Sequence, residues 1–371
     1  MRFLHTADWH IGKNLNDYSL LEQQADLLNQ ITLLLADDTY DCLVISGDLY
    51  DRAQPAKSAL ELVNKTFHTI IEKYKKPILL IAGNHDSDIL IDYGSQLLEK
   101  QHLYAQGTSL KEPKTVLIKN TTFHLLPFIS PFVAAPLYQR EFEDFNDLLT
   151  HQINTIKLNP KTYNVLIAHA YVTYESQIFE MQESVRPISI GTAQYVDAKL
   201  FADFDYVALG HLHRAQTIVK DKVYYSGAIY KYSKSEANNI ISVNDVSFKN
   251  NQIIVDKIPL ILKKDVKILQ DQFEDLLKRK SDDFVYIELL DSSFHLHAIN
   301  KLRDNYPSIL GLEYPKLTTN YERDNKDKEI IKTLSPDQQF ENFFEKFSDK
   351  KLTISQKKLV KEIFEELNHD H

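Results

Sequence analysis

The sequence predicts an α/β protein in which central sheets are flanked by helices. Two observations lead to this fold class. In the first two-thirds of the 371 residues, short apolar runs of about strand length alternate with longer segments of helical period. Hydrophobic residues make up 43% of the chain and charged residues 26%, so the chain can bury a core and lacks the composition of a disordered protein. Its length suits two or three folding units.

The first unit, residues 1–258, contains this alternation. Residues 19–37 place leucines and an isoleucine at helical intervals, after Ser19 and Glu22 at the spacing of a capping box, and predict an amphipathic helix. Residues 57–75 repeat the one-sided apolar pattern and predict a second helix. Strands are expected at the runs RFLHT, CLVIS, ILLIA, NVLIA and YVALG.

The composition changes after about residue 258. Residues 259–318 predict a small α+β unit, with a helix at 263–283, a strand at 283–291, a helix at 294–307 and a strand at 309–317. Residues 319–335 are highly charged and predict a linker. Residues 336–371 predict a helical segment. Its apolar positions are Phe340, Phe343, Phe344 and Phe347 on one helix and Leu359, Val360, Ile363, Phe364 and Leu367 on the next.

Charge and cysteine content narrow the class of protein. The formal net charge of −9 argues against a uniformly basic nucleic-acid coat, and leaves room for local basic patches, bound cations or a partner that supplies positive surface. Cys42 is the single cysteine, so no intrachain disulfide is expected and the cytoplasm is the expected compartment. No apolar run approaches the roughly 18 residues that span a bilayer, so we expect no membrane function.

Potential metal ligands come directly after five of the expected strands in the sequence. The motifs are RFLHTADWH with Asp8 and His10, CLVISGDLYD with Asp48 and Asp51, ILLIAGNHD with Asn84 and His85, NVLIAHA with His169, and YVALGHLH with His211 and His213. Ligands of open α/β sheets bind at the carboxyl ends of the strands, so these ends are expected to meet at one site. Gly47, Gly83 and Gly210 stand at the breaks between strand and loop, where a positive φ or a close backbone approach turns the next side chain inward.

The expected site has the ligand chemistry of a pair of divalent cations. Aspartate, imidazole and amide oxygen without thiolate suit Mn²⁺, Mg²⁺, Fe²⁺ or Zn²⁺, and the mixture favours manganese, with magnesium as an alternative. Seven candidate ligands are more than one ion requires, and a carboxylate can bridge two ions about 3.5 to 4 Å apart. Each motif alone is more often a turn or a satisfied polar group; their order along the chain favours a shared dinuclear site.

The ordered series resembles the calcineurin-like metallophosphoesterase superfamily across roughly residues 1–230. The forms HTADWHIG, SGDLYDRAQP and GNHDS resemble, within it, the bacterial nuclease subunits that act with a coiled-coil ATPase. The resemblance implies that Asp8, His10, Asp48 and His213 hold one ion, and that Asp48, Asn84, His169 and His211 hold the other. It further implies that His85 is the catalytic acid; the alternative is a structural turn residue.

Two neighbouring residues have no assigned role. Asp51 departs from the archaeal and eukaryotic counterparts, which have histidine there, and fits the wider phosphoesterase pattern. Arg52 resembles a phosphate-binding arginine of phosphoprotein phosphatases, although an exposed arginine paired with aspartate is the commoner state.

The resemblance also implies substrate and partners. It predicts a manganese-dependent 3′ to 5′ double-strand exonuclease and hairpin or single-strand endonuclease, present as a homodimer within a heterotetramer. Residues 259–318 resemble a capping, DNA-contacting domain, in which Lys263, Lys264 and residues 278–280 would meet phosphates. Residues 336–367 would bind the ATPase through Phe340, Phe343, Phe344, Phe347, Leu359, Ile363 and Phe364. A small-molecule or protein phosphoesterase and a metal-free scaffold of the same fold are the alternatives.

Overall fold

The computed structural model describes residues 1–174, 195–249, 252–317, 335, 338–341, 344 and 351–369. The chain divides into two compact units. The first comprises residues 1–269, 279–287 and 299–311, and the second comprises residues 270–278, 288–298 and 312–371. In the described part of the chain, no helix is both long and apolar enough to cross a membrane.

The first six-stranded sheet has the order β16-β15-β1-β4-β5-β6. Its strands are β1 (Arg2–Thr6), β4 (Cys42–Ser46), β5 (Ile78–Ile81), β6 (Leu103–Gln106), β15 (Ser242–Lys249) and β16 (Gln252–Pro259). The four strands from β1 to β6 run parallel, whereas β15 and β16 are antiparallel to their neighbours. The carboxyl ends of β1, β4 and β5 therefore share one edge.

The second six-stranded sheet has the order β13-β14-β12-β9-β8-β7. Its strands are β7 (Lys114–Ile118), β8 (Thr121–Leu126), β9 (Tyr163–His169), β12 (Tyr206–Gly210), β13 (Gln216–Val219) and β14 (Val223–Tyr225). The central strands β8, β9, β12 and β14 are parallel. Two small pairs complete the strands of this region, β2 (Asn14–Leu15) with β3 (Tyr18–Ser19) and β10 (Tyr171–Thr173) with β11 (Tyr195–Asp197).

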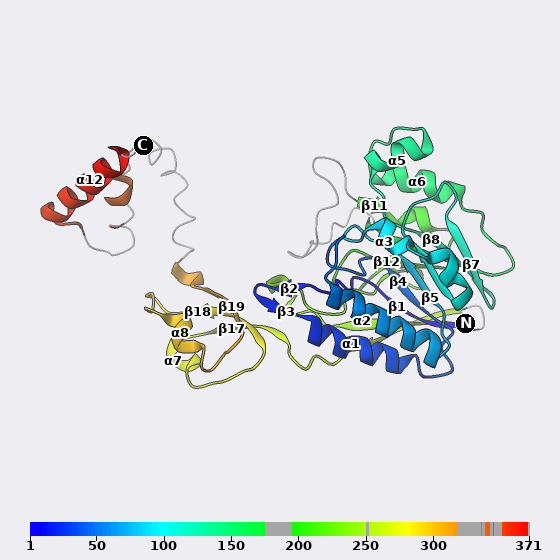
Figure 1. Cartoon of the computed structure of the whole chain (residues 1–371), viewed down its shortest axis with the longest axis horizontal. Coiled ribbons are helices and arrows are strands. Elements are labelled where there is room, and N and C mark those ends of the chain that lie inside the picture. Colours follow the sequence, from blue (N-terminus) through cyan, green and yellow to red (C-terminus); the bar gives the residue numbers. More distant parts are fainter. Residues whose placement is uncertain are drawn as a thin grey trace. The chain divides into compact units, whose positions relative to one another are not determined.

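The two sheets pack face to face and are covered by helices on their outer faces (Figure 1). Alternation along a strand assigns each face: Phe3 and Val44 join Phe123 in the core between the sheets, whereas Leu4 and Leu43 join the outer core. Phe3 and Phe123 meet edge to face with ring centroids 5.4 Å apart. The outer helices include α1 (Leu21–Leu34) and α2 (Lys57–His68) on the first sheet and α6 (Phe145–Thr155) on the second. The predicted fold class, sheets flanked by helices, is confirmed.

The remaining helical elements of the first unit are short. They are η1 (Thr69–Lys73), a π-helical continuation of α2, then α3 (Asp88–Asp92), α4 (Ser95–Leu98), η2 (Glu99–Gln101), α5 (Pro131–Tyr138), η3 (Ala198–Phe201) and η4 (Lys234–Glu236). The capping box predicted for residues 19–37 is wrong. Ser19 belongs to β3, and α1 begins after Leu20, which is the N-cap residue and makes no side-chain cap.

The small α+β unit has a three-stranded sheet in the order β17-β18-β19. Its elements are β17 (Val266–Asp271), α7 (Phe273–Leu276), β18 (Phe284–Leu289), α8 (Ala298–Leu302) and β19 (Ile309–Glu313). The helix predicted over 263–283 is wrong, because this range holds the strand β17 and the single helical turn α7. The strands predicted at 283–291 and 309–317 are present, and the helix predicted at 294–307 is reduced to five residues.

Most of the described residues in the C-terminal segment are helical. Residues 338–341 and 344 are helical, and α12 (Ile354–His369) carries the second predicted apolar set. The predicted linker, residues 319–335, lies outside the described residues except for Ser335, and Phe343 and Phe347 lie outside them too. The domain boundaries proposed from the sequence remain a prediction.

Candidate metal centre

The seven predicted ligands lie at the ends of five strands. Asp8 and His10 follow β1, Asp48 follows β4, Asn84 follows β5, His169 ends β9, and His211 and His213 follow β12. Three of these strands belong to the first sheet and two to the second, so the ligands approach one another from both sheets. All of these residues are buried except Asn84, which is partly exposed.

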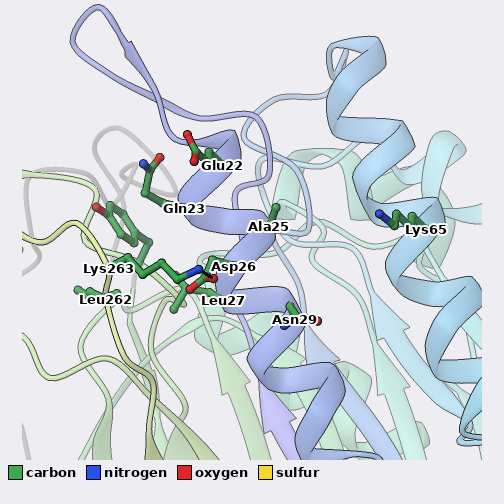
Figure 2. Close-up of a pocket in the computed structure, with 10 residues that line it drawn as sticks. Glu22, Gln23, Ala25, Asp26, Leu27, Asn29, Lys65, Leu262 and Lys263 are labelled. Atoms are coloured by element: carbon green, nitrogen blue, oxygen red, sulfur yellow. Dashed lines mark ion pairs between the residues drawn. The ribbon is translucent and has the colours of Figure 1, made fainter.

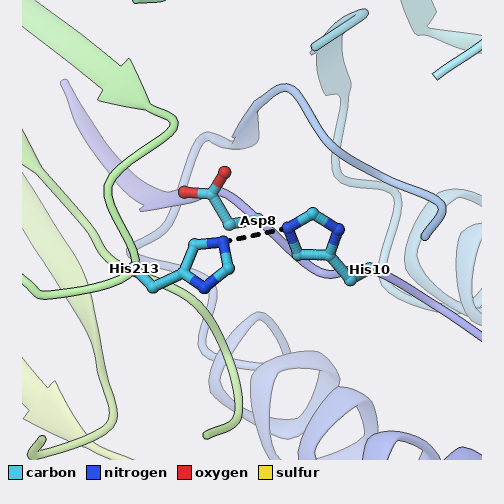
Figure 3. Close-up of side chains that lie close together, drawn as sticks. All are labelled: Asp8, His10 and His213. Carbon is cyan, nitrogen blue, oxygen red and sulfur yellow. Dashed lines mark hydrogen bonds between the residues drawn. The ribbon is translucent and has the colours of Figure 1, made fainter. Parts of the chain in front are cut away.

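Two groups of the predicted ligands bring their ligand atoms within 4.8 Å of one another, and a third group of the same kind joins His10 to Asp51 and His85. The first is Asp8, His10 and His213, where the Nε2 atoms of the two imidazoles lie 3.1 Å apart (Figure 3). The second is Asp8, Asp48 and His169. Asp8 belongs to both groups, so the groups adjoin.

Asp48, a member of the second group, also lies near the first. Its Oδ2 atom is 3.6 Å from Nε2 of His10 and 3.5 Å from Nε2 of His169. The Asn84 amide oxygen is 2.9 Å from Nε2 of His169 and 3.2 Å from Nδ1 of His211. All seven predicted ligands are thus linked by short contacts.

The backbone at these ligands is unusual. Asp8, His10, Asp48 and His211 have φ angles of 52°, 44°, 51° and 107°. Residues other than glycine seldom adopt positive φ, which costs on the order of 1 to 3 kcal/mol and persists only where the surrounding structure enforces it. The backbone bonds from Asp8 N to Gly47 O and from His10 N to Asp48 O, each 3.0 Å, join the two loops that carry these residues.

All three predicted glycines allow this close approach, and a Cβ on Gly210 would lie 2.0 Å from the Ser46 carbonyl oxygen and 2.8 Å from Nδ1 of His169. Gly47 has a φ of 90°, and a Cβ at this position would lie 2.5 Å from Nδ1 of His169. A Cβ on Gly83 would lie 2.2 Å from Oδ1 of Asp48. A side chain at any of these positions would therefore displace a candidate ligand.

Hydrogen bonds behind the imidazoles orient two of them. Nδ1 of His169 donates to the Ser46 carbonyl at 2.9 Å, and Nδ1 of His213 lies 3.1 Å from Oε1 of Glu236. In both residues Nε2 is then the nitrogen that faces the cluster. Among the described residues, buried Nδ1 of His10 and Nε2 of His211 have no hydrogen-bond partner.

Several carboxylates and imidazoles of the cluster have shifted pKa values that favour the binding of positive charge. Burial raises the pKa of Asp8 to about 6. Burial and the charge of Asp48 raise the pKa of Asp86 to about 7. Burial lowers the pKa of His10 and of His211, which favours neutral imidazoles. Carboxylates that resist ionisation beside neutral imidazoles with unpartnered nitrogens fit divalent cations.

His85 lies at the edge of the cluster. Its backbone N donates to Oδ1 of Asp48 at 2.9 Å, its Nδ1 lies 2.9 Å from the Asp51 carbonyl, and its ring centroid is 4.6 Å from that of His10. The Asp51 carboxylate forms ion pairs with Lys13 at 2.8 Å and with Arg52 at 3.5 Å. Arg52 is mostly exposed and pairs with Asp51, which is the state expected for it on general grounds.

Three residues that organise the site were absent from the sequence-based candidates. The Asp86 carboxylate accepts the backbone N–H groups of Leu49, Tyr50 and Gly83, and so ties the loop after β4 to the loop after β5. Gln24 on α1 donates to the carbonyls of Trp9 and His10, and Glu236 contacts His213. A polar residue on the buried face of a predicted helix was a signal for Gln24; nothing in the sequence indicated Glu236.

The predicted basic contacts include Lys263, Lys264 and Lys278. Lys263 forms an ion pair with Asp26 beside a hollow of about 400 Å³ lined by residues of α1, as Figure 2 shows. Lys264 donates to Ser308 at 2.7 Å, and Lys278 pairs with Asp275 at 2.8 Å. These three lysines therefore have partners within the chain.

The predicted partner-binding residues lie in the second unit. The rings of Phe340 and Phe364 have centroids 6.3 Å apart, so the two C-terminal helical stretches touch. Phe340 is 39% exposed and Leu359 on α12 is 56% exposed. The side chain of Ile363 is outside the described part of the chain.

Comparisons with known proteins agree with these features. The calcineurin-like phosphoesterase family model matches residues 1–215, and a model described as the type 5 capsule protein repressor C-terminal domain matches residues 260–347. The D subunit of the nuclease SbcCD from Staphylococcus saprophyticus is 31% identical over 376 aligned residues, which cover 98% of this chain and 97% of that protein.

Two solved structures show more remote likeness. A dimetal phosphatase from Danio rerio has a TM-score of 0.41 at 12% identity, with 71% of this chain and 98% of that chain covered. GAP50, the anchor in the inner membrane complex of Plasmodium, has a TM-score of 0.39 at 12% identity, with coverage of 70% and 84%. We draw no conclusion from likenesses this distant. The family match over more than half of the chain and the 31% identity across nearly all of it show that the chain belongs to the calcineurin-like phosphoesterase family and, within it, to the SbcD-type proteins.

Proposed function

We propose that this chain is the metal-dependent DNA nuclease component of an SbcCD-type complex. It hydrolyses phosphodiester bonds as a 3′ to 5′ double-strand exonuclease and as a hairpin or single-strand endonuclease, in DNA repair, recombination and replication. The observation that carries the proposal is the meeting of seven ligand side chains from five strand ends in a chain that is similar to a nuclease component over its whole length. The single free cysteine is buried, in keeping with a cytoplasmic protein.

The metal centre holds two ions in this proposal. Asp8, His10, Asp48 and His213 hold one, and Asp48, Asn84, His169 and His211 hold the other. The position of Asp48 Oδ2, at similar distances from His10 and His169, supports a bridging role. The mixture of carboxylate, amide and imidazole favours Mn²⁺, with Mg²⁺ as the alternative. Such ions neutralise the scissile phosphate and lower the pKa of the attacking water.

His85 supplies the proton for the leaving oxygen. The hydrogen bond from Nδ1 to the Asp51 carbonyl holds the ring beside His10 and fixes the proton on Nδ1. Proton exchange with the substrate then falls to Nε2. The backbone bond from His85 to Asp48 keeps this acid in a constant position relative to the metal ligands.

A homodimer forms through an apolar surface around α2 and α4. A hollow of about 450 Å³ there is lined by Leu60, Tyr93 and Leu98, which are 38%, 82% and 40% exposed. Ile89 and Leu97 nearby are 73% and 74% exposed. An exposed apolar patch of this kind usually marks an interface, and a second copy of the chain presents the same apolar chemistry.

The ATPase partner and DNA complete the complex. The C-terminal helices bind an SbcC-type coiled-coil ATPase, giving a heterotetramer, and the exposed positions of Phe340 and Leu359 support this assignment. Residues 259–318 contact DNA as a capping domain, with the basic residues at 263, 264 and 278–280 near phosphates.

The test is a cleavage assay with a blocked-end duplex, a DNA hairpin and a small phosphodiester, with and without the ATPase. We expect Mn²⁺-dependent cleavage of DNA that the ATPase stimulates and that Asp48→Asn abolishes. Asp203→Asn, an exposed site, is the matched control. Hydrolysis of the small ester or of a phosphoprotein without DNA cleavage would favour the phosphoesterase alternative.

A further inference from the structure

Glu236 is a fully buried carboxylate outside the predicted ligand set. It lies on η4, and its Oε1 atom is 3.1 Å from Nδ1 of His213 and 3.0 Å from the Ser233 hydroxyl. Its Oε2 atom accepts the backbone N–H of Tyr232 at 2.9 Å. A buried carboxylate is tolerated only when its oxygens are paired, and both oxygens have donors here. The fold therefore holds a buried charge directly behind one candidate ligand.

The contact decides which nitrogen of His213 faces the cluster. An ionised carboxylate only accepts hydrogen bonds, so the imidazole proton lies on Nδ1 and the lone pair lies on Nε2. Nε2 is the atom that lies 3.1 Å from His10, within the group formed with Asp8 (Figure 3). A carboxylate partner also makes the imidazole a stronger ligand than a neutral partner does.

The other candidate position lacks this support. His169 is oriented by the Ser46 carbonyl, which is neutral. The Asn84 amide oxygen, which lies beside His169 and His211, is neutral too. Asp48 lies between both positions and favours neither. Asp8 belongs to both groups of ligand atoms, so the negative charge that distinguishes the position at His10 and His213 is that of Glu236. At short range in a buried site, such a difference in charge dominates the affinity for a cation.

We propose that Glu236 is a positioning residue for His213 and makes the position at Asp8, His10 and His213 the tighter of the two metal positions. The inference rests on the proposed dinuclear centre and adds an order of filling to it. The first ion enters beside Asp8, and the second enters beside Asn84, His169 and His211.

Calorimetric titration of Mn²⁺ into the metal-stripped full chain tests the role of Glu236. We expect two binding events in the wild type. Glu236→Gln weakens the tighter event by roughly 10- to 100-fold, the usual effect of losing such a partner, while the weaker event is unchanged. Asn84→Ala weakens the second event instead. Ser233→Ala is the matched control, because it removes another donor to the same oxygen and keeps the carboxylate.

Thermal unfolding in a chelator establishes that each variant is folded before titration. If Glu236→Gln leaves the tighter event unchanged, or weakens only the other event, the inference is wrong. Asn84→Ala acting on the tighter event would contradict it equally.

A second measurement needs no variant. Crystals of the wild type grown with one equivalent of Mn²⁺ are expected to show an anomalous peak beside Asp8, His10 and His213. A peak beside Asn84, His169 and His211 would reverse the order and overturn the inference while leaving the dinuclear centre intact. A wild-type chain that binds no manganese in either measurement would overturn the metal centre itself and this inference with it.

Discussion

Single residues of this site hold conformations that their own chemistry disfavours. Four of the seven candidate ligands have positive φ angles, although that conformation is unfavourable for aspartate and histidine. The carboxyl groups of Asp8, Asp48 and Asp86 lie close enough to interact, and burial raises the pKa of Asp8 and of Asp86. Residues that would be unfavourable alone are therefore held by the surrounding loops, which is typical of functional sites.

His85 can be tested apart from metal binding. His85→Ala removes the proposed acid and keeps all seven ligands. We expect cleavage of DNA to fall by roughly 10²- to 10⁴-fold, the usual contribution of general acid catalysis, with Mn²⁺ affinity unchanged in calorimetry. His102→Asn is the control, because His102 is exposed at a left-handed position that asparagine tolerates. Full activity in His85→Ala would refute the role.

Gly83 is expected to be irreplaceable for a steric reason. In Gly83→Ala the new Cβ would lie 2.2 Å from Oδ1 and 2.4 Å from N of Asp48, so the loop that carries Asp48 must move. We expect a loss of stability of about 1 to 3 kcal/mol, as in other overpacked sites, and a marked loss of Mn²⁺ affinity. Gly94→Ala, at a positive φ away from the site, is expected to lose stability without losing metal. Normal Mn²⁺ binding by Gly83→Ala would contradict this account.

At the scale of elements, strands position the site and exposed helices offer surfaces to partners. The loops after β1 and β4 are joined by backbone hydrogen bonds, so the two elements place Asp8, His10 and Asp48 as one body. By contrast, α4 and α12 carry apolar side chains that are largely exposed, among them Leu97 and Leu359. Burial of such side chains by another chain is favourable, because it removes apolar surface from water.

The α4 surface gives a prediction about oligomeric state. Leu97→Glu would place a charge in the proposed interface, at a cost of about 3 kcal/mol or more if the charge is buried without a partner. We expect Leu97→Glu to be monomeric at concentrations where the wild type is dimeric. Light scattering measures the difference. Gln96→Glu adds the same charge at the neighbouring exposed residue and is expected to stay dimeric. A dimeric Leu97→Glu chain would exclude this surface.

The C-terminal helices give a prediction about the ATPase. Removal of the residues after 330 should abolish co-purification with the ATPase and leave Mn²⁺-dependent hydrolysis of a small phosphodiester intact, because the ligands all precede residue 214. Leu359→Glu should weaken the same association, whereas Ser355→Glu, an exposed position on α12, should not. Retained association of the truncated chain would contradict the assignment.

At the scale of the whole molecule, metal binding and folding are coupled. The site joins loops from both six-stranded sheets, so a ligand that binds only the folded state stabilises the entire sandwich. With free Mn²⁺ at 100 times its dissociation constant, the stabilisation is about 2.7 kcal/mol. We expect the melting temperature to rise by several degrees in Mn²⁺ and to return in excess chelator, as measured by calorimetry. Asp48→Asn should lose the shift and Asp203→Asn should keep it; equal shifts in both would locate the effect elsewhere.

The sequence by itself determined the sheet-and-helix fold class and the identity of the candidate ligands. Each ligand stands within about four residues of a strand end, so a local pattern of an apolar run followed by polar residues, with a glycine between them in three of the five motifs, was sufficient to find it. Only the tertiary structure decided that residues 266–271, within the predicted helix 263–283, form a strand, because pairing with a neighbouring strand overrides local helical spacing. It also decided the positions of Asp86 and Glu236. Their partners Leu49, Tyr50 and His213 lie more than 20 residues away in the sequence. A local sequence pattern cannot predict contacts between residues that far apart.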